Sequence, residues 1–404
     1  MSTHSGNRSI LFLSTTNLAA NPRLTKELRL ATTNGFAATV IQFELGNWSD
    51  AKTRALENDF RGVEFILLSA LRQSFLPWFW SSVLERLFRL LPVWLLTDFM
   101  LGVAVSKRSA LLLNAVKQIN GSFDWVIAHN PGAFYPAYSY ARKKKVRLGI
   151  DVEDYHPGET NDPGLASFTI RLMRQVLPKA DYCSYASPLI ARGVQEDLPL
   201  LTKNQLIILN GFSQEEFTEP SLIMKEALQL VWFSQYIGAK RGLENIIPLA
   251  NALYPAVELH LIGNLQPDFE ADYLTQKRGI TLHSSMLQKE LHFFLSGCDI
   301  GLAIEPGKDM NNRLAISNKL IAFAQAGLFI VASHTPAQDQ FLSNSELEYI
   351  QTDLSAGDLR HVFEQLISQK EGIRNRKRER FEKGRVYDWE EISRPLLHVW
   401  LHSS

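Results

Sequence analysis

Short apolar runs alternate with amphipathic segments along most of this chain. In the first half, runs typical of buried strands lie at residues 10–14, 38–43, 124–128, 146–150, 182–186 and 206–209. The pattern resumes after a polar segment, with runs at residues 228–233, 257–262, 280–282, 300–303, 328–332 and 347–350. Helical spacing separates most of the runs, as in residues 22–33. Strands that alternate with helices predict two α/β halves, each a parallel sheet covered on both faces.

The length of the chain and the restart of the pattern predict two domains, because 404 residues exceed one ordinary hydrophobic core. We place the first domain at residues 1–212, a polar linker at 213–227 and the second domain at 228–380. Residues 381–404 form a last segment. Its helix needs a partner surface for its large apolar side chains, which are Ile392, Leu396, Leu397 and Trp400.

Composition limits the class of protein. Apolar residues make up 46% of the chain and charged residues 21%, as in ordinary globular proteins. Lys and Arg total 42, as do Asp and Glu, so no global field attracts the chain to nucleic acid. Cys183 and Cys298 are too few for a disulfide scaffold or a cysteine zinc site, and the first residues lack a secretory signal. These features predict a cytoplasmic protein. The charged run 374–385 predicts a helix with a solvated face.

A basic loop follows the strand predicted at 228–233. The apolar run stops at Ser234, the loop carries Gly238, Lys240, Arg241 and Gly242, and a helical pattern follows at once. Free N–H groups and the dipole of a helix N-terminus favour an anion, and two cations strengthen that preference. The sequence therefore indicates a diphosphate site, with an ordinary turn carrying solvated basic side chains as the alternative.

Residues 75–104 are unusually rich in large apolar side chains. Four charged residues and two prolines interrupt the run, so it should not span a bilayer. Trp78, Trp80 and Trp94 could instead lie at the headgroup level of a membrane surface or line a groove for a lipid-linked substrate. The alternative is a pair of helices packed into the first domain.

Six motifs occur in order along the chain, several of them directly after a predicted strand. They are Asn21-Pro22-Arg23-Leu24-Thr25-Lys26-Glu27, residues 151–159, Asn210-Gly211-Phe212, the basic loop at 234–242, residues 317–327, and Trp389. In this order and spacing, over nearly its whole length, the chain resembles the family 4 glycosyltransferases of the GT-B fold.

The resemblance implies an α/β architecture with two Rossmann-like domains, an interdomain cleft and a C-terminal helix that crosses back to the first domain. It implies that the first domain binds the acceptor and the second binds a nucleotide-sugar donor. It also implies sugar transfer with retention of configuration and without a bound metal or other cofactor. The expected acceptor is a glycan or a lipid-linked glycan in surface polysaccharide or glycoconjugate synthesis.

The resemblance assigns the donor site to the second domain. Arg241, or Lys240 if the register shifts by one, matches the family's phosphate-binding basic residue, and Lys319 is the second cation. Because negative charge grows on the leaving diphosphate, these cations would stabilise the transition state in place of a metal. The other expected donor-binding residues are Ser234, Gly238, Gly263, Glu305 and Asn318.

The acidic cluster at 151–159 is assigned to the active site in the first domain. Asp151 and Glu153 are expected near the reacting sugar, without a fixed acid or base role. Arg23 is expected to bind an acceptor phosphate bidentately. The other expected acceptor-binding residues are Asn21, His129, Asp154 and His156. A structural role is the alternative for His129, and turn formation is the alternative for the acidic cluster.

The sequence departs from the family pattern at two positions. Many members carry two glutamates eight positions apart, and here Leu314 and Ala322 occupy those positions. Glu305, Asn311 and Asn312 are candidates to replace them in part. The leading interpretation is a cytoplasmic transferase acting at the inner face of the cell membrane. The alternatives are an inactive GT-B partner subunit, which the missing carboxylates favour, and a nucleotide-sugar epimerase, which fits the motifs less well.

Overall fold

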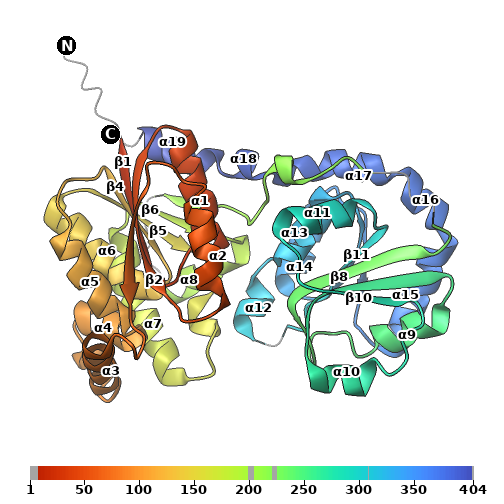
Figure 1. Cartoon of the computed structure of the whole chain (residues 1–404), viewed down its shortest axis with the longest axis horizontal. Coiled ribbons are helices and arrows are strands. Elements are labelled where there is room, and N and C mark those ends of the chain that lie inside the picture. The colour runs from red at the N-terminus through yellow and green to blue at the C-terminus, as the bar shows by residue number, and fades with distance from the viewer. Residues whose placement is uncertain (1–7, 199–203, 221–224, 308, 403–404) are drawn as a thin grey trace, which may run out of the picture. The chain divides into compact units, whose positions relative to one another are not determined.

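The computed structural model describes residues 8–198, 204–220, 225–307 and 309–402, which form two compact units (Figure 1). The first unit contains residues 1–208 and 395–404, and the second contains residues 209–394. The segment expected as a linker, 213–227, thus falls within the range of the second unit. The end of the chain falls within the first.

The first unit is built on a parallel sheet. Within the described residues its order is β3-β2-β1-β4-β5-β6-β7. The strands are β1 (Ser9–Ser14), β2 (Ala37–Glu44), β3 (Glu64–Ser69), β4 (Trp125–His129), β5 (Arg147–Val152), β6 (Tyr182–Tyr185) and β7 (Gln205–Ile207). The apolar pattern located all of them except β3. That strand lies at the sheet edge, where exposed Leu67 blurs the alternation of buried and exposed positions.

Helices cover both faces of this sheet, with α1 on one side and α5 and α6 on the other (Figure 1). Asn21 caps α1 by accepting a hydrogen bond from the Leu24 N–H at 2.9 Å. The helices are α1 (Pro22–Thr33), α2 (Trp48–Glu57), α3 (Phe75–Arg89), α4 (Asp98–Val105), α5 (Arg108–Gln118), α6 (Pro131–Lys144), α7 (Pro163–Val176), α8 (Pro188–Asp197) and α19 (Arg394–His402). Short 3-10 turns are η1 (Val93–Leu95), η2 (His156–Gly158) and η3 (Leu177–Lys179).

The second unit repeats this architecture. Among the residues that the structure describes, its parallel sheet has the order β10-β9-β8-β11-β12-β13. The strands are β8 (Leu228–Ile237), β9 (Val257–Leu265), β10 (Ile280–His283), β11 (Ile300–Ala303), β12 (Phe329–Ser333) and β13 (Tyr349–Thr352). β8 continues past Ser234 through a register shift between Phe233 and Tyr236, so it is longer than the sequence predicted.

The helices of the second unit also lie on both faces of its sheet, with α9 and α15 opposite α11 and α13 (Figure 1). They are α9 (Ile246–Leu253), α10 (Pro267–Tyr273), α11 (Gln288–Ser296), α12 (Met310–Leu314), α13 (Asn318–Gln325), α14 (Pro336–Ser343), α15 (Ala356–Ser368), α16 (Lys370–Asn375), α17 (Lys377–Gly384) and α18 (Trp389–Ile392). The 3-10 turns are η4 (Gln214–Glu216) and η5 (Arg385–Tyr387).

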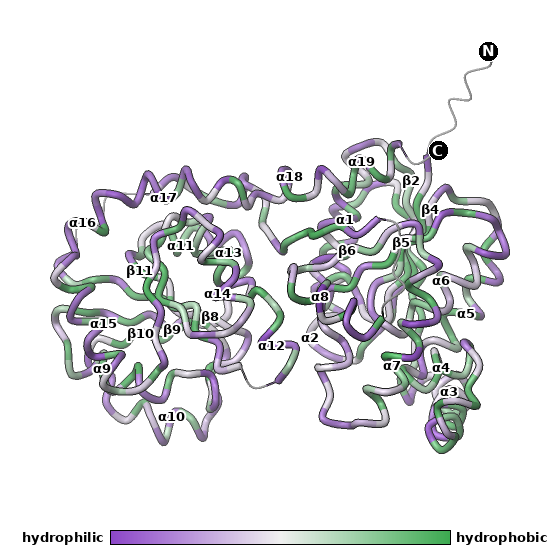
Figure 2. Tube along the Cα trace, turned by 180° about the vertical axis from the view of Figure 1, so that it is seen from behind, coloured by the Kyte–Doolittle hydropathy of each residue, from purple (hydrophilic) through white to green (hydrophobic). Residues whose placement is uncertain are grey.

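The charged run 374–385 presents a solvated face, as the sequence predicted, but two of its cations are buried. Figure 2 shows α17 as largely hydrophilic, yet Lys377 and Arg380 are buried in the second unit. The Lys377 ammonium donates to the carbonyl oxygens of Ser296 and Cys298, both at 2.5 Å, and burial lowers the pKa of Lys377 to about 8. Arg380 donates to the Gly327 carbonyl at 3.0 Å. The charge pattern did not predict the burial of these two residues, because their hydrogen-bond acceptors include backbone carbonyls, which carry no sequence signature.

Helix α3 leaves most of its large apolar side chains exposed. Phe75, Leu76, Phe79, Trp80, Val83 and Leu87 are exposed, as are Leu90, Trp94 and Leu95 after the helix. Trp78 differs, because Lys107 and Arg72 lie over its ring. In the part of the chain that the structure describes, no helix is long and apolar enough to cross a membrane. The expectation of two helices packed fully into the first domain therefore does not hold for α3.

Helix α19 completes the core of the first unit. Trp400 packs edge-on against Phe12 and Phe36, and its indole N–H donates to the Tyr182 hydroxyl at 3.1 Å. The Trp125 indole N–H donates in turn to the Trp400 carbonyl at 3.3 Å. Leu396 and Trp400 are thus buried in the first unit, whereas Ile392 falls within the range of the second.

We expect Trp400→Ala to lower the free energy of unfolding by about 3–5 kcal/mol, because it opens a large cavity and removes the hydrogen-bond donor of the Tyr182 hydroxyl. The measurement is urea unfolding of the full chain. His398→Ala, at an exposed position of α19, is the matched control and should change stability by less than about 0.5 kcal/mol. Equal losses in the two variants would contradict this account of the last helix.

Candidate functional site

A row of polar side chains crosses the carboxyl edge of the first sheet. The strand registers pair Ser14 with His129, His129 with Asp151, and Asp151 with Ser184. Each of these residues lies at or near the end of an apolar strand, and register partners in a parallel sheet point to the same face. The Ser184 hydroxyl donates to Asp151 Oδ1 at 2.7 Å, so this row is hydrogen-bonded as well as aligned.

Helix α1 covers the polar row with Arg23 and Glu27. Arg23 lies 3.2 Å from Glu27 Oε1 and 3.1 Å from Asp151 Oδ1. His129 lies between the two carboxylates, with Nε2 at 3.3 Å from Glu27 Oε2 and Nδ1 at 3.4 Å from Asp151 Oδ2. All four side chains are buried. We call these four residues the buried charge network.

Electrostatics keep this network charge-balanced. Burial lowers the pKa of His129, but the Glu27 charge and hydrogen bonding to Asp151 and Glu27 outweigh it and raise that pKa to about 9. Burial raises the pKa of Asp151, but the charge of Arg23 and the contact with His129 bring it down to about 2. At neutral pH two cations therefore face two carboxylates.

This arrangement corrects two predictions for the acceptor site. Arg23 is 1% exposed and also donates to the Ile208 carbonyl at 2.5 Å, so its guanidinium holds the fold together instead of presenting itself to an acceptor phosphate. Asn21 is buried as the cap of α1. His129 and Asp151 are buried as well and can act on a substrate only through neighbouring groups.

The acidic cluster becomes accessible just beyond Asp151. Glu153 and Asp154 are half-buried. Burial, followed by the charges of Asp154 and Asp151, raises the pKa of Glu153 to about 7. His156 is buried and its Nδ1 lies 2.6 Å from Glu159 Oε2. Glu153 and Asp154 are therefore the least buried of the predicted first-unit residues.

Sequence reasoning did not single out Glu27, although two signals pointed to it. It lies four positions after Arg23 on α1, which is ion-pair spacing, and it falls inside the first motif. It looked like an ordinary solvated glutamate because the depth of α1 against the strand ends cannot be read from the sequence.

The second unit places its predicted donor residues at the carboxyl edge of its own sheet. Gly263 follows the core of β9, and a Cβ there would clash with the Ser234 carbonyl oxygen. A Cβ on Gly242, which has φ +80°, would clash with Ile304 beyond β11. A Cβ on Gly238 would likewise clash with the side chain of Gln266. These glycines let three strand-end loops approach one another.

Arg241 is the half-buried cation of this edge. In the described parts of the chain it forms no hydrogen bond and no ion pair. Lys240 is exposed, adopts φ +61°, and its backbone N–H donates to the Glu244 carboxylate. The helix α9 begins only at Ile246, so the loop is longer than predicted and its basic residues do not lie at a helix N-terminus. Any binding of an anion here therefore depends on Arg241 and the loop, and not on the dipole of α9.

Lys319 and Glu305 form an ion pair at the same edge. Their Nζ and Oε1 atoms lie 2.5 Å apart, and Lys319 also lies over the Trp232 ring at 5.8 Å. The Ser333 hydroxyl donates to the Glu305 carbonyl at 2.7 Å and accepts from its backbone N–H, which fixes the loop after β11. Asn318 begins α13 and is exposed.

The two positions at which the family pattern has glutamates, 314 and 322, differ in burial. Ala322 is 0% exposed within α13, whereas Leu314 is half-buried at the end of α12. Among the described residues, no group of three or more His, Cys, Asp or Glu side chains is placed to hold a metal ion.

Comparison with solved structures identifies the architecture. A scan against protein-family models gives no match, and a search of the curated proteins gives none either. HepE from Anabaena, in complex with UDP and glucose, is 14% identical with a TM-score of 0.66, covering 98% of this chain and 100% of that one. A glycosyltransferase from Rickettsia africae is 12% identical with a TM-score of 0.66, covering 99% and 100%. The lipopolysaccharide outer core galactosyltransferase WaaB is 10% identical with a TM-score of 0.60, covering 96% and 98%. The chain therefore has the predicted GT-B fold, with two parallel-sheet α/β domains.

The raised pKa of His129 predicts a pH-dependent stability. Its pKa of about 9 in the folded chain lies above the ordinary 6.5, so protonated His129 contributes its full stability below pH 6.5. That contribution is lost as the pH rises through 9. We expect urea unfolding of the full chain to show a decrease on the order of a few kcal/mol across this window.

His129→Gln should remove most of this pH dependence while lowering stability at pH 6.5, because Glu27 and Asp151 lose a cation. His398→Gln, at an exposed position, should keep the wild-type slope. A wild-type slope in the His129 variant would mean that other groups titrate in this range.

Proposed function

We propose that this protein is a nucleotide-sugar-dependent glycosyltransferase whose donor diphosphate binds at the carboxyl edge of the second sheet. One observation carries the proposal: half-buried Arg241 has no counterion among the described residues, at the edge where ligands of doubly wound sheets bind. A partly desolvated guanidinium without a carboxylate favours an anionic ligand, and it binds phosphate bidentately. The similar HepE fold holds UDP and glucose, which supports a nucleotide-sugar as that ligand.

The chemistry that these residues would perform is stabilisation of the leaving group. As the glycosidic bond to the diphosphate breaks, negative charge grows on the phosphate oxygens and positive charge grows on the anomeric carbon. Arg241 and Lys319 would stabilise the diphosphate, and Glu305 would orient the Lys319 ammonium through their ion pair. Transfer would need no metal and would proceed with retention of configuration.

The loops around these cations would hold the rest of the donor. Ser234, Gly238 and Gly263 belong to the loops beside these cations, and the two glycines let those loops pack closely against their neighbours. Asn318 would bind a hydroxyl or phosphate oxygen at the start of α13, with Lys240 as a peripheral cation. These assignments keep the donor within the second unit.

The first unit would supply the acceptor side. Glu153, with a pKa raised to about 7, can accept or donate a hydrogen bond to a sugar hydroxyl near neutral pH. Asp154 would bind a second hydroxyl. Asp151 and His129 would act by positioning the Glu153 loop, while Arg23, Asn21 and His156 serve the fold.

The donor site can be tested with nucleotides alone. We expect Arg241→Ala to weaken binding of nucleoside diphosphates about 10–100-fold, since a charge-assisted hydrogen bond contributes about 1.5–3 kcal/mol. Calorimetry with UDP, GDP and ADP also identifies the base. Arg278→Ala, which removes an exposed arginine of the same unit, is the matched control and should bind normally. Lys319 is best tested as Glu305→Gln/Lys319→Met, which leaves no unpaired charge.

A catalytically inactive GT-B subunit is the competing function, and the apolar residues Leu314 and Ala322 favour it. The same measurement separates the two. If none of the nucleotides binds the wild-type chain, the donor site is lost and the inactive-subunit reading replaces the transferase. If nucleotides bind, a panel of sugar donors and glycan acceptors, read by mass spectrometry, identifies the reaction.

We further propose that the acceptor is lipid-linked and that the protein works on the inner face of the cell membrane. The exposed apolar residues of α3 and the segment after it form a surface of a size and aromatic content that suits the membrane interface. The similar fold of WaaB belongs to a transferase of the lipopolysaccharide outer core, which supports an acceptor anchored in a membrane.

Membrane contact can be tested by removing exposed tryptophans. Trp80 and Trp94 are 59% and 67% exposed, so Trp80→Ser/Trp94→Ser should preserve the fold and reduce co-sedimentation with liposomes several-fold. Trp48→Ser is the matched control, because Trp48 is 54% exposed on α2 of the same unit. Equal binding by the double variant and the control would show that this surface does not contact membranes.

A further inference from the structure

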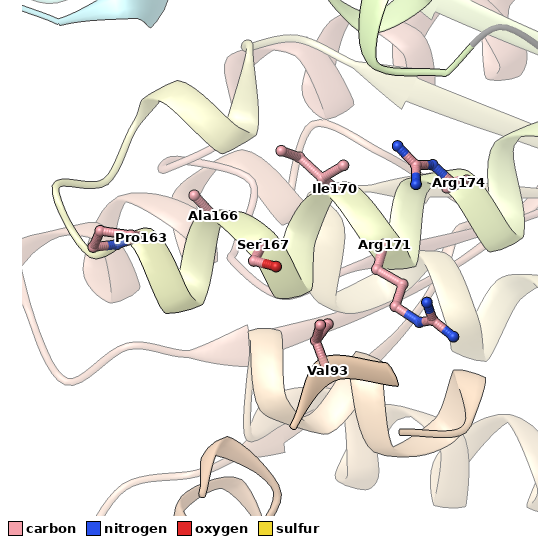
Figure 3. A pocket seen from close by; sticks show the side chains of 7 residues that line it. All are labelled: Val93, Pro163, Ala166, Ser167, Ile170, Arg171 and Arg174. Carbon is pink, nitrogen blue, oxygen red and sulfur yellow. The ribbon is translucent and has the colours of Figure 1, made fainter. Parts of the chain in front are cut away.

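A pocket of about 420 Å³ lies between η1 and α7 in the first unit. Figure 3 shows that its lining comes from Val93 on η1 and from one stretch of α7. The residues that line it are Val93, Pro163, Ala166, Ser167, Ile170, Arg171 and Arg174. The lining thus combines aliphatic side chains with two guanidinium groups and one hydroxyl.

Arg171 is the residue that marks this pocket as a binding site. In the described parts of the chain its Nε atom is buried without a hydrogen-bond partner, and its guanidinium forms no ion pair. A buried N–H without an acceptor is unfavourable, and a ligand oxygen would satisfy it. Figure 3 shows the Arg171 side chain extending from α7 on the side of Val93.

The acidic groups near the pocket are already engaged. Asp162 precedes α7 and accepts from the backbone N–H groups of Gly164 and Leu165. Asp197 accepts from the Tyr155 hydroxyl at 2.6 Å, and its backbone carbonyl accepts from Arg174 at 2.9 Å. Neither carboxylate forms an ion pair with Arg171 or Arg174, so the pocket keeps a positive character.

One lining residue, Val93, connects the pocket to the exposed apolar segment that follows α3. Val93 belongs to the same short segment as Leu90, Trp94 and Leu95, whose side chains are exposed. A ligand with a hydrocarbon chain and an anionic head would therefore find apolar contacts and guanidinium groups side by side. A terminal phosphate monoester fits best, because it offers three acceptor oxygens to a guanidinium, whereas a phosphodiester is substituted on both sides.

We propose that this pocket binds the phosphate monoester headgroup of a lipid held in the bilayer that α3 contacts. Arg171 would bind the phosphate bidentately, Arg174 and Ser167 would complete its coordination, and Val93 and Ile170 would contact the first carbons of the chain. The proposal rests on the membrane contact proposed above and not on the donor chemistry of the second unit.

The test is co-sedimentation with phosphatidylcholine vesicles that contain a second lipid. Phosphatidic acid and a polyprenyl phosphate are the two monoester sources, and phosphatidylglycerol at matched surface charge is the phosphodiester control. We expect the monoester lipids to strengthen binding at least about tenfold over phosphatidylglycerol. The monoester lipid that binds more tightly identifies the source. Equal binding to the monoester and phosphodiester vesicles would overturn the proposal.

Variants separate the pocket from general surface charge. A surface arginine near a membrane contributes roughly fivefold to binding. Arg171→Gln should abolish the preference for monoester lipids, and Arg171→Lys should retain only part of it. Arg192→Gln, which removes an exposed arginine of α8 outside the pocket, should keep the preference intact. If Arg192→Gln and Arg171→Gln weaken binding equally, the attraction is diffuse and the pocket is not the site.

A soluble short-chain phosphatidic acid provides a measurement without a bilayer. It should change the fluorescence of Trp94, next to Val93, in the wild type but not in Arg171→Gln. No change in either protein would overturn the pocket assignment. Loss of binding to neutral vesicles in Trp80→Ser, which keeps Trp94, with a retained response to the soluble lipid would support the pocket separately from the membrane surface.

Discussion

The first unit depends on four buried charges at the carboxyl edge of its sheet. They are two carboxylates and two cations. Moving an ion out of water costs several kcal/mol, so Glu27 and Asp151 can be buried only because Arg23 and protonated His129 face them. The same contacts tie α1 to β4, β5 and the Ile208 carbonyl. Burial, followed by the charges of Asp154 and Asp151, raises the pKa of nearby Glu153, and the charges of Arg23 and His129 oppose that rise only in part. The network therefore influences the protonation of Glu153 in both directions.

In the second unit, loops also meet at the carboxyl edge of the sheet, but the charges there are not balanced. Its strand-end loops approach through glycines. Its charged groups include one internal pair, Lys319 with Glu305, the exposed Lys240, and half-buried Arg241, which the described residues leave without a counterion. A balanced edge is stable without a ligand, whereas an unbalanced, half-buried cation is stabilised by one. Under the proposed function, this difference in charge balance would make the edge of the second sheet the one that binds the diphosphate.

The sequence predicted the parallel sheets well because buried strands are apolar without interruption, and twelve of the strands in the described chain fall near their expected positions. It also placed polar residues such as His129 and Asp151 at strand ends. It could not tell that Arg23 and Asn21 would be buried, since burial depends on how deeply α1 packs. It misjudged Lys377 and Arg380 for a related reason, because their partners are backbone carbonyls that carry no sequence signature. The start of α9 was placed too early because Leu243, which suits a helix, is buried in the loop instead.

The motifs that suggested the family are unequal as evidence for function. Asn210-Gly211-Phe212 and Trp389 contact each other: the Trp389 N–H donates to the Phe212 carbonyl at 3.0 Å, and a Cβ on Gly211 would clash with the Tyr387 carbonyl. Gln325 joins them by donating to the Phe212 carbonyl and to Asp388, at 2.9 and 2.8 Å. These motifs are needed to connect the start and end of the second unit, so any chain with this architecture has reason to keep them. The family resemblance assigns ribose and sugar recognition instead to glutamates at positions 314 and 322, where this chain is apolar. Agreement in the connecting motifs thus supports the fold, and the ligand must be argued from Arg241, Lys319 and the loops around them.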